Sequence, residues 1–381
     1  MLDFTITETS FGLNLYCLVI FLFMVVSYHK TSLYGNTYSV VEHRYYTSWS
    51  FLFFFFVASL TFFVNADFFH YMEMVKDYEF DGKNHGEEIY GTIIYWLDKN
   101  YFLFRVCVWG GALWLLIKTF TQYAIDKALG LYIVLLLFFI IFSYSRATLA
   151  MAMFFYGFSL LTSSQESKNV YSLLGHILFG VLFMGLSYLF HHSIIVLIVM
   201  SFFLWIPVNR VSFIFYVLFY LIILLLFETL VSDLFLSNFI MEENEYVSER
   251  VNSYLSKEYD EYNLLGAIQS IYGYSIFYLS MIIITKYFLF QSHVSYPKFY
   301  RLLYKLTLLI FVLATTLFLV FDLEQNVFFY RILYMSFIPI TILLAYLYQN
   351  NILSKNKMIF ILLWGGGYMM WVLVRSVYIF L

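Results

Sequence analysis

The stretch FSYSRATLAMAMFFYGFSLL, residues 142–161, places one charged residue, Arg146, between two apolar segments. The apolar run after it approaches the length of about 20 residues that a helix needs to cross the hydrocarbon of a bilayer. A charged side chain near the bilayer centre costs about 2.5 to 3.5 kcal/mol on insertion scales, so an arginine here indicates a function. The stretch therefore predicts a membrane helix and singles out Arg146.

The composition of the whole chain agrees with a membrane protein. Hydrophobic residues make up 62% of the 381 residues and charged residues only 12%, and the mean hydropathy is +0.81. Most of such a chain must have lipid as its solvent, which excludes a soluble globular enzyme. We therefore expect an all-α polytopic integral membrane protein, with no nucleic-acid partner.

Apolar segments recur along the chain, and we expect them to form about twelve transmembrane helices in one domain, residues 1–381. The N-terminus carries Asp3 and Glu8 without a basic residue, which argues against a cleaved signal peptide. The expected helices lie at roughly 11–28, 49–66, 101–118, 128–144, 145–163, 171–190, 192–207, 211–230, 264–286, 303–322, 326–348 and 358–380.

Lysine and arginine residues are concentrated in every second loop. Loops rich in these residues are expected on the cytoplasmic side. Acidic residues gather in the opposite set, in two longer loops at about 67–100 and 231–262, where apolar spacing predicts short interfacial helices. Both chain ends are then expected outside. The basic set is Lys30, Arg44, Lys118, Lys127, Lys168, Arg210, Lys286, Lys298, Arg301, Lys305, Lys355 and Lys357.

Five arginines do not follow this alternation and fall near the expected outer face: Arg105, Arg146, Arg250, Arg331 and Arg375. Arg105 can be interpreted as snorkelling from a helix end, and Arg375 as paired inside the bundle. The other three come from distant parts of the chain, and guanidinium suits a bidentate grip on phosphate oxygens. They predict an outer site for a phosphorylated substrate.

A histidine pair, His191 and His192, lies between two apolar segments expected to meet at the outer surface. Such a pair can fill the interface, or it can supply a general base, because imidazole titrates near neutral pH. No histidine motif or cysteine cluster suggests a metal. Cys17 and Cys107 fall inside predicted spans, so no disulfide framework is expected.

Motifs for nucleotides are absent from the sequence. The chain has no GxxxxGK[ST] phosphate loop, no GxGxxG turn and no Asp-x-Asp pair of the sort that holds a metal and a nucleotide-sugar. We expect neither a cofactor nor a metal. An arginine-rich outer site would suit a substrate that arrives in the membrane already activated as a lipid diphosphate.

The order of several short motifs resembles the EpsG-type, Wzy-like bacterial polymerases of O-antigen, capsule and exopolysaccharide. The similarity spans roughly residues 30–345, and the family's Phe-His-x-Ser spacing selects His191 over His192. The family often has Arg-Gln where this chain has Arg146-Ala147. The motifs are Asp67 with Tyr71, Glu88-Ile89-Tyr90, Arg146 with Leu149-Ala150, Phe190-His191-His192-Ser193, Arg250 with Tyr254, and Arg331-Ile332-Leu333-Tyr334.

The resemblance implies joining of oligosaccharide repeat units carried on polyprenyl diphosphate, at the outer face of the bacterial cytoplasmic membrane. It implies the all-helical lipid-linked glycosyltransferase fold, called GT-C-like, with membrane lipid, a flippase and a chain-length regulator as candidate partners. Arg146, Arg250 and Arg331, with Arg105 as a further candidate, would hold the diphosphate. His191 is the first choice of base and Asp67 or Glu88 the second, while Tyr254 and Tyr334 would position sugar or phosphate.

Two other functions fit parts of the sequence. A flippase or exporter of lipid-linked glycans would also use interior arginines, but it needs a pathway to the cytoplasmic side. A membrane O-acyltransferase acting on surface polysaccharide would use a histidine reached from the inner side, whereas His191 is expected outside.

Overall fold

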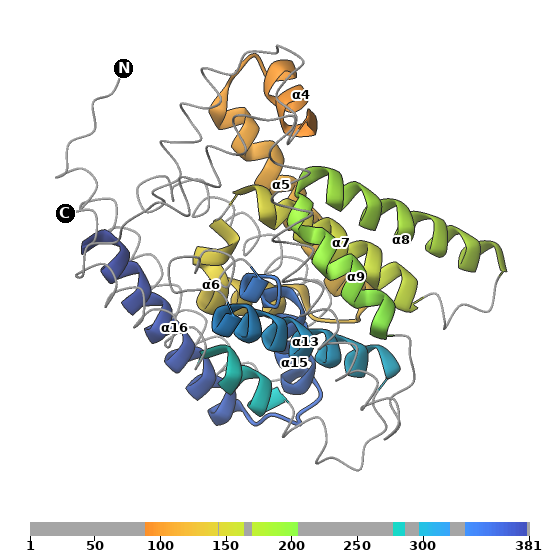
Figure 1. Ribbon diagram of the computed structural model, residues 1–381. Coiled ribbons are helices and arrows are strands. Elements are labelled where there is room, and N and C mark those ends of the chain that lie inside the picture. The colour runs from red at the N-terminus through yellow and green to blue at the C-terminus, as the bar shows by residue number, and fades with distance from the viewer. Residues whose placement is uncertain are drawn as a thin grey trace.

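Figure 1 shows the computed structural model of the protein, which describes residues 88–143, 145–163, 170–204, 277–285, 297–320 and 332–378. Throughout these ranges the chain is helical and forms no β-strand. The predicted all-α class is therefore confirmed for the part that the structure describes. The expected helices at 11–28, 49–66 and 211–230 lie outside the described residues.

Several predicted helix boundaries agree with the structure. The segment expected at 145–163 is α7 (Ser145–Ser163), and the one expected at 171–190 is α8 (Val170–Phe190). The remaining elements are α4 (Glu88–Trp96), α5 (Tyr101–Gln122), α6 (Lys127–Ser143), the 3-10 turn η3 (His192–Ile194), α9 (Ile195–Leu204), α13 (Lys298–Val320), α15 (Phe337–Gln349) and α16 (Lys355–Tyr378).

The helix expected at 326–348 is broken in the structure, and a proline explains the break. A short helical turn at 332–334 is followed by a turn at 335–336, after which α15 begins at Phe337. Pro339 has no backbone N–H, and its ring would clash with the carbonyl of the residue four positions earlier, Met335. A continuous helix through Met335 is therefore disfavoured, whereas a proline in the first turn of α15 is tolerated.

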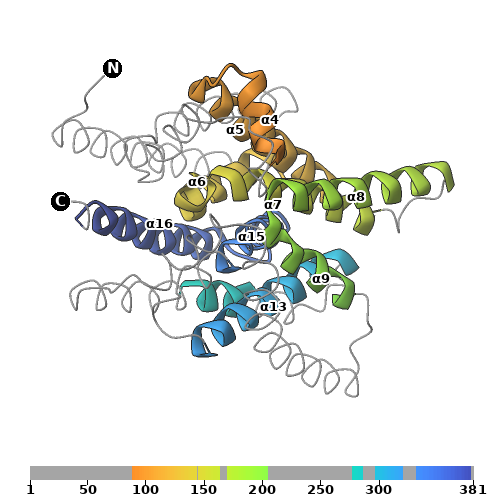
Figure 2. The same ribbon diagram turned by 45° about the horizontal axis from the view of Figure 1, so that its top comes forward.

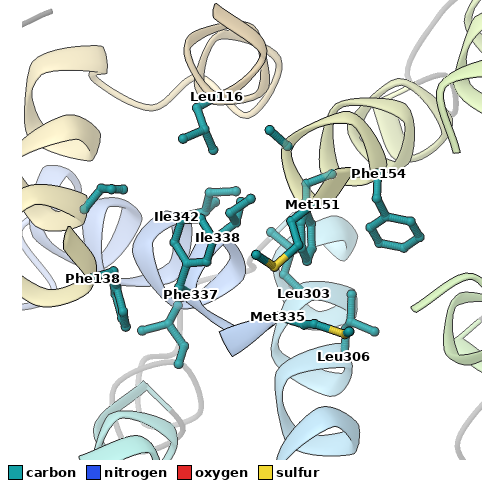
Figure 3. Close-up of a cluster of buried hydrophobic side chains, with 14 of the residues drawn as sticks. Leu116, Phe138, Met151, Phe154, Leu303, Leu306, Met335, Phe337, Ile338 and Ile342 are labelled. Atoms are coloured by element: carbon teal, nitrogen blue, oxygen red, sulfur yellow. The ribbon is translucent and has the colours of Figure 1, made fainter. Parts of the chain in front are cut away.

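Helix α15 lies in the middle of the bundle, with ten of its residues buried. Figure 3 shows side chains from α5, α6, α7 and α13 gathered around its first half. They include Leu116, Phe138, Met151 and Leu303, which pack with Phe337 and its neighbours in one hydrophobic core. A helix that is apolar on every side can be surrounded by protein or by lipid, and the burial of ten residues shows that protein surrounds most of α15.

Helices α7 and α8 form an antiparallel pair, and they lie side by side in both Figure 1 and Figure 2. Their backbones approach closely at two glycines: a Cβ atom on Gly157 would stand 2.6 Å from the carbonyl oxygen of Gly180. Small residues at the contact allow such an approach, which is how helices in lipid gain packing energy. The outward faces of α8 remain apolar and exposed, as in Leu178 and Val181.

Hydrogen bonds join the α5–α6 connection to α13 and α15 at one end of the bundle. The Tyr300 hydroxyl donates to the Tyr123 carbonyl at 2.7 Å, and Gln349 Nε2 donates to the Ala124 carbonyl at 3.0 Å. The Asp126 N–H donates in turn to Gln349 Oε1 at 3.0 Å. The helix ends that meet here also carry Lys118, Lys127, Lys298, Arg301, Lys305, Lys355 and Lys357, all from the basic set.

Three helical segments of the described chain are long and apolar enough to cross a membrane: Leu103–Gln122, Val170–Phe190 and Ile332–Gln349. Helix α7 contributes a shorter apolar stretch, Ala147–Thr162. These lengths and compositions are those of a membrane protein.

Candidate functional site

The end of the bundle away from this basic set joins two of the sequence motifs. Tyr90 in the first turn of α4 is only 1% exposed. Its ring meets the ring of Phe190 edge-on at 5.3 Å between centroids, and that of Phe104 at 5.9 Å. Tyr90, the last residue of the Glu88-Ile89-Tyr90 motif, therefore packs against the residue that precedes His191, although about a hundred residues separate them in the chain.

A short turn connects α4 to α5 and fixes where α5 begins. Asp98 and Lys99 adopt left-handed backbone angles, with φ of 51° and 55°. Asn100 then caps α5, because its side-chain oxygen accepts a hydrogen bond from the Leu103 N–H at 3.1 Å. Such a cap satisfies one of the free N–H groups at a helix start. Through this turn α5 and α4 reach the same end of the bundle.

His191 lies between α8 and η3, where the helix direction changes. Its N–H still donates to the Ser187 carbonyl of α8 at 3.1 Å, and its own carbonyl accepts from the Ile194 N–H at 3.0 Å. The imidazole Nδ1 is 2.7 Å from the hydroxyl oxygen of Ser193. In the sequence Ser193 stands out only as part of the Phe190–Ser193 motif, and its contact with the ring is a finding of the structure.

The buried face of α8 leads to His191. Gly180, Met184 and Ser187 are its buried residues, and His191 follows Ser187 by one further helical turn. Residues at this spacing share one face of an α-helix. The face that packs on α7 therefore continues to His191.

The glycine contact aligns Arg146 with His191 along the α7–α8 pair. Position 146 lies eleven residues before Gly157 in α7, and His191 lies eleven residues after Gly180 in the antiparallel α8. Eleven residues make about three helical turns, so both positions return to the glycine face at about the same height. Helix α7 also contacts η3. The backbone of Arg146, in the first turn of α7, therefore lies near the Phe190–Ser193 motif.

Arg105 is buried, which makes the snorkelling interpretation wrong. Its residue surface is 5% exposed, and the central guanidinium carbon lies 4.1 Å from the centroid of the Trp109 ring, one turn along α5. The negative face of an indole attracts such a cation, and the attraction is larger away from water. Burial of the cation against tryptophan therefore replaces the expected reach to the membrane surface.

The other predicted site residues divide into two groups. Glu88 is the first residue of α4, and Tyr334 is half-buried in the turn before α15, where it packs on the hydrophobic core. Asp67, Arg250, Tyr254 and Arg331 lie outside the described residues. The structure therefore brings together the motifs that contain Glu88, Arg146 and His191, and the chemical roles of all these site residues stay predictions.

Neither a metal-binding cluster nor a disulfide is part of the candidate site among the described residues. In the ranges that the structure describes, no three histidine, cysteine, aspartate or glutamate side chains gather as a metal site would require. Cys107 is a free, exposed thiol on α5, and Cys17 falls outside the described chain.

Comparison with known proteins identifies one family. A sequence model described as the EpsG family matches residues 44–380, which is most of the chain and includes every predicted site residue. No curated protein and no solved structure matches the chain. On the strength of this match, the chain belongs to the EpsG family.

Proposed function

We propose that this protein polymerises polysaccharide from oligosaccharide repeat units linked to polyprenyl diphosphate. Its family and its apolar helices support a polysaccharide polymerase of the membrane. The observation that carries the proposal is the meeting of three separate motifs at one end of the bundle. There Tyr90 packs on Phe190, His191 follows, and Arg146, the second residue of α7, lies at about the same height along the helix pair.

The reaction needs a base and a group that accepts negative charge. A hydroxyl of one repeat unit attacks the anomeric carbon of another, and the bond from that carbon to the diphosphate oxygen breaks. His191 takes the hydroxyl proton as the new glycosidic bond forms, and polyprenyl diphosphate leaves with the bonding electrons. No nucleotide or metal is required for this balance. Asp67 and Glu88 are the alternative bases.

Arginine is the side chain suited to the leaving group. Three arginines, Arg146, Arg250 and Arg331, would neutralise the negative charge that grows on the diphosphate. Preorganised electrostatic stabilisation of this kind is often the largest contribution to catalysis. Arg105 lies one turn inside α5 from the Asn100 cap and directly follows Phe104, and it would add positive potential at this end. Tyr254 and Tyr334 would orient sugar or phosphate by hydrogen bonds.

The proposal extends to architecture and location. We infer about twelve membrane helices in a GT-C-like arrangement, with the site open to the extracytoplasmic side of a bacterial cytoplasmic membrane. The gathering of basic residues at the opposite end supports this orientation, because basic loops favour the cytoplasm. A flippase and a chain-length regulator are the expected protein partners.

The test uses purified protein in liposomes with lipid-linked repeat units isolated from a strain that lacks it. We expect glycan dimers and longer chains, with one polyprenyl diphosphate released for each bond formed. Movement of an intact substrate between leaflets would instead identify a flippase or exporter. Appearance of acyl esters on the glycan without lipid diphosphate release would identify an O-acyltransferase.

A further inference from the structure

The contact between Ser193 and His191 differs from those of the serines nearby. Ser159, Ser187 and Ser201 each donate to a carbonyl three residues earlier in their own helix, at 2.6 to 2.7 Å. Ser193 instead meets the imidazole Nδ1 two residues earlier, at 2.7 Å. The first three hydroxyls satisfy themselves within a helix, whereas the Ser193 hydroxyl is directed to a titratable ring.

The turn that carries Ser193 is anchored on the core. Ile194, which ends η3, and Leu197 in α9 are both fully buried. The hydrogen bond from the Ile194 N–H to the His191 carbonyl closes the turn and keeps Ser193 beside the ring. The backbones of His191 and Ser193 are both joined to buried elements. The fold of the turn therefore sets the distance between the two side chains.

The direction of this hydrogen bond decides what His191 can do. If the Ser193 hydroxyl donated to Nδ1, the ring proton of neutral histidine would lie on Nε2, which could not then accept another proton. If Nδ1–H donates to the Ser193 oxygen, Nε2 keeps its lone pair and can act as a base. A hydroxyl can serve as donor or acceptor, so both directions are chemically available.

We propose that Ser193 is a positioning residue that accepts a hydrogen bond from Nδ1–H of His191 and so keeps the ring proton off Nε2, whose lone pair takes the acceptor proton. This inference rests on the proposed function, with His191 as the base. During the reaction the acceptor O–H proton moves to Nε2 while the sugar–oxygen bond forms and the sugar–diphosphate bond breaks. His191 becomes a cation, and hydrogen bonds from a cationic donor are about twice as strong.

A contact that strengthens in the transition state changes kcat rather than KM. Threonine and valine have nearly the same shape, but only threonine has a hydroxyl, so Ser193→Thr and Ser193→Val form a matched pair. We expect Ser193→Thr to keep kcat within about threefold, and Ser193→Val to lose about 10- to 100-fold with KM unchanged. Ser193→Ala, which adds no bulk, should lose as much as Ser193→Val. Equal activity of the threonine and valine variants would overturn the proposal.

A double variant tests whether Ser193 acts through His191. In a His191→Ala background the valine substitution should cause no further loss, because the ring that it positions is gone. An additional loss as large as that in the wild type would show an independent role and overturn the inference.

A spectroscopic test needs no substrate and therefore separates this inference from the proposed polymerase activity. Protein labelled with ¹⁵N-histidine, compared with a His191→Asn sample to assign the resonance, reports which ring nitrogen holds the proton. We expect Nδ1–H in the neutral wild-type ring and a mixture of tautomers in Ser193→Val. A neutral ring protonated on Nε2 in the wild type would reverse the hydrogen bond and refute the positioning role, even if polymerisation were observed.

Discussion

Gly157 of α7 lies directly against Gly180 of α8, so that a Cβ atom at position 157 would stand 2.6 Å from the Gly180 carbonyl oxygen. No side chain longer than hydrogen fits there without moving a helix. This contact sets the register of the pair and, with it, the common height of Arg146 and His191. The geometry of the proposed site therefore depends on a contact about three helical turns away.

Replacing Gly157 should separate α7 from α8. We expect Gly157→Ala to destabilise the protein by about 1 to 3 kcal/mol, because the added methyl meets backbone atoms. Polymerisation should fall more than stability alone explains. Thermal unfolding in detergent and glycan length measure the two effects.

The matched control is Gly185→Ala, since a Cβ atom at Gly185 of α8 meets nothing within 4 Å. It should leave glycan length unchanged and raise stability by up to about 1 kcal/mol, because alanine is the better helix former. Equal effects of the two substitutions would argue against the close glycine contact.

Tyr90 should hold α4 on α8 through its ring. We expect Tyr90→Ala to cost about 3 to 5 kcal/mol, as truncation of a buried aromatic side chain does, and to reduce polymerisation. Tyr90→Phe keeps the ring contact with Phe190 and should retain most of the stability. Tyr95→Ala on the same helix is the control, because Tyr95 is 63% exposed; a comparable loss there would contradict the assigned role.

Arg105 and Trp109 should be energetically coupled. A double-mutant cycle with Arg105→Met and Trp109→Leu is expected to give a coupling of about 2 kcal/mol, the value for a cation–π contact removed from water. The exposed pair of Lys118 and Trp114, at 5.5 Å, should give a smaller value. Unfolding free energies of the four variants in each cycle supply the measurement, and similar couplings would count against the buried contact.

Arg146→Lys tests the proposed grip on diphosphate. Lysine keeps the charge but not the planar fork, so we expect a loss of about 10²- to 10³-fold in kcat, as for other lost transition-state donors. Arg301→Lys, at an exposed position on α13, serves as control and should behave like the wild type. Wild-type glycan length in the Arg146→Lys strain would refute this role.

Tyr123 should make stability fall at high pH. Burial raises the pKa of this phenol, which follows the last residue of α5 and shares a hydrogen bond of 3.1 Å with Thr162. The unfolded chain loses its phenol proton above about pH 10 while the folded chain keeps it. The stabilisation is therefore complete below pH 10 and is lost as pH rises, by about 1.4 kcal/mol per pH unit.

The comparison for this prediction is the Tyr123→Phe variant. Between about pH 10 and pH 11.5 its unfolding temperature should fall less steeply with pH than that of the wild type. Tyr171→Phe removes the hydroxyl of an exposed tyrosine and should leave the wild-type slope unchanged. Parallel slopes for wild type and Tyr123→Phe would mean that the buried phenol does not contribute to the loss.

Local pattern predicted the helices well where composition alone decides them. The segment 145–163 was bounded correctly because an apolar run follows Arg146 and ends in polar residues. The break before α15 was missed, although Pro339 was visible, because its effect depends on where the first turn begins. The burial of Arg105 was also missed, since a snorkelling arginine and one stacked on tryptophan have the same spacing from a helix end.

Sequence by itself determined that this is a helical membrane protein, and it predicts a base and several arginines near the outer face. Lipid cannot hydrogen-bond the backbone, so long apolar segments must form helices whatever their neighbours are. Only the tertiary structure decided that Tyr90 meets Phe190, that Gly157 meets Gly180 and that Ser193 reaches His191. Such contacts depend on the shapes of surfaces from distant segments, or on the path of a turn, and neither is written in the periodicity of a single helix.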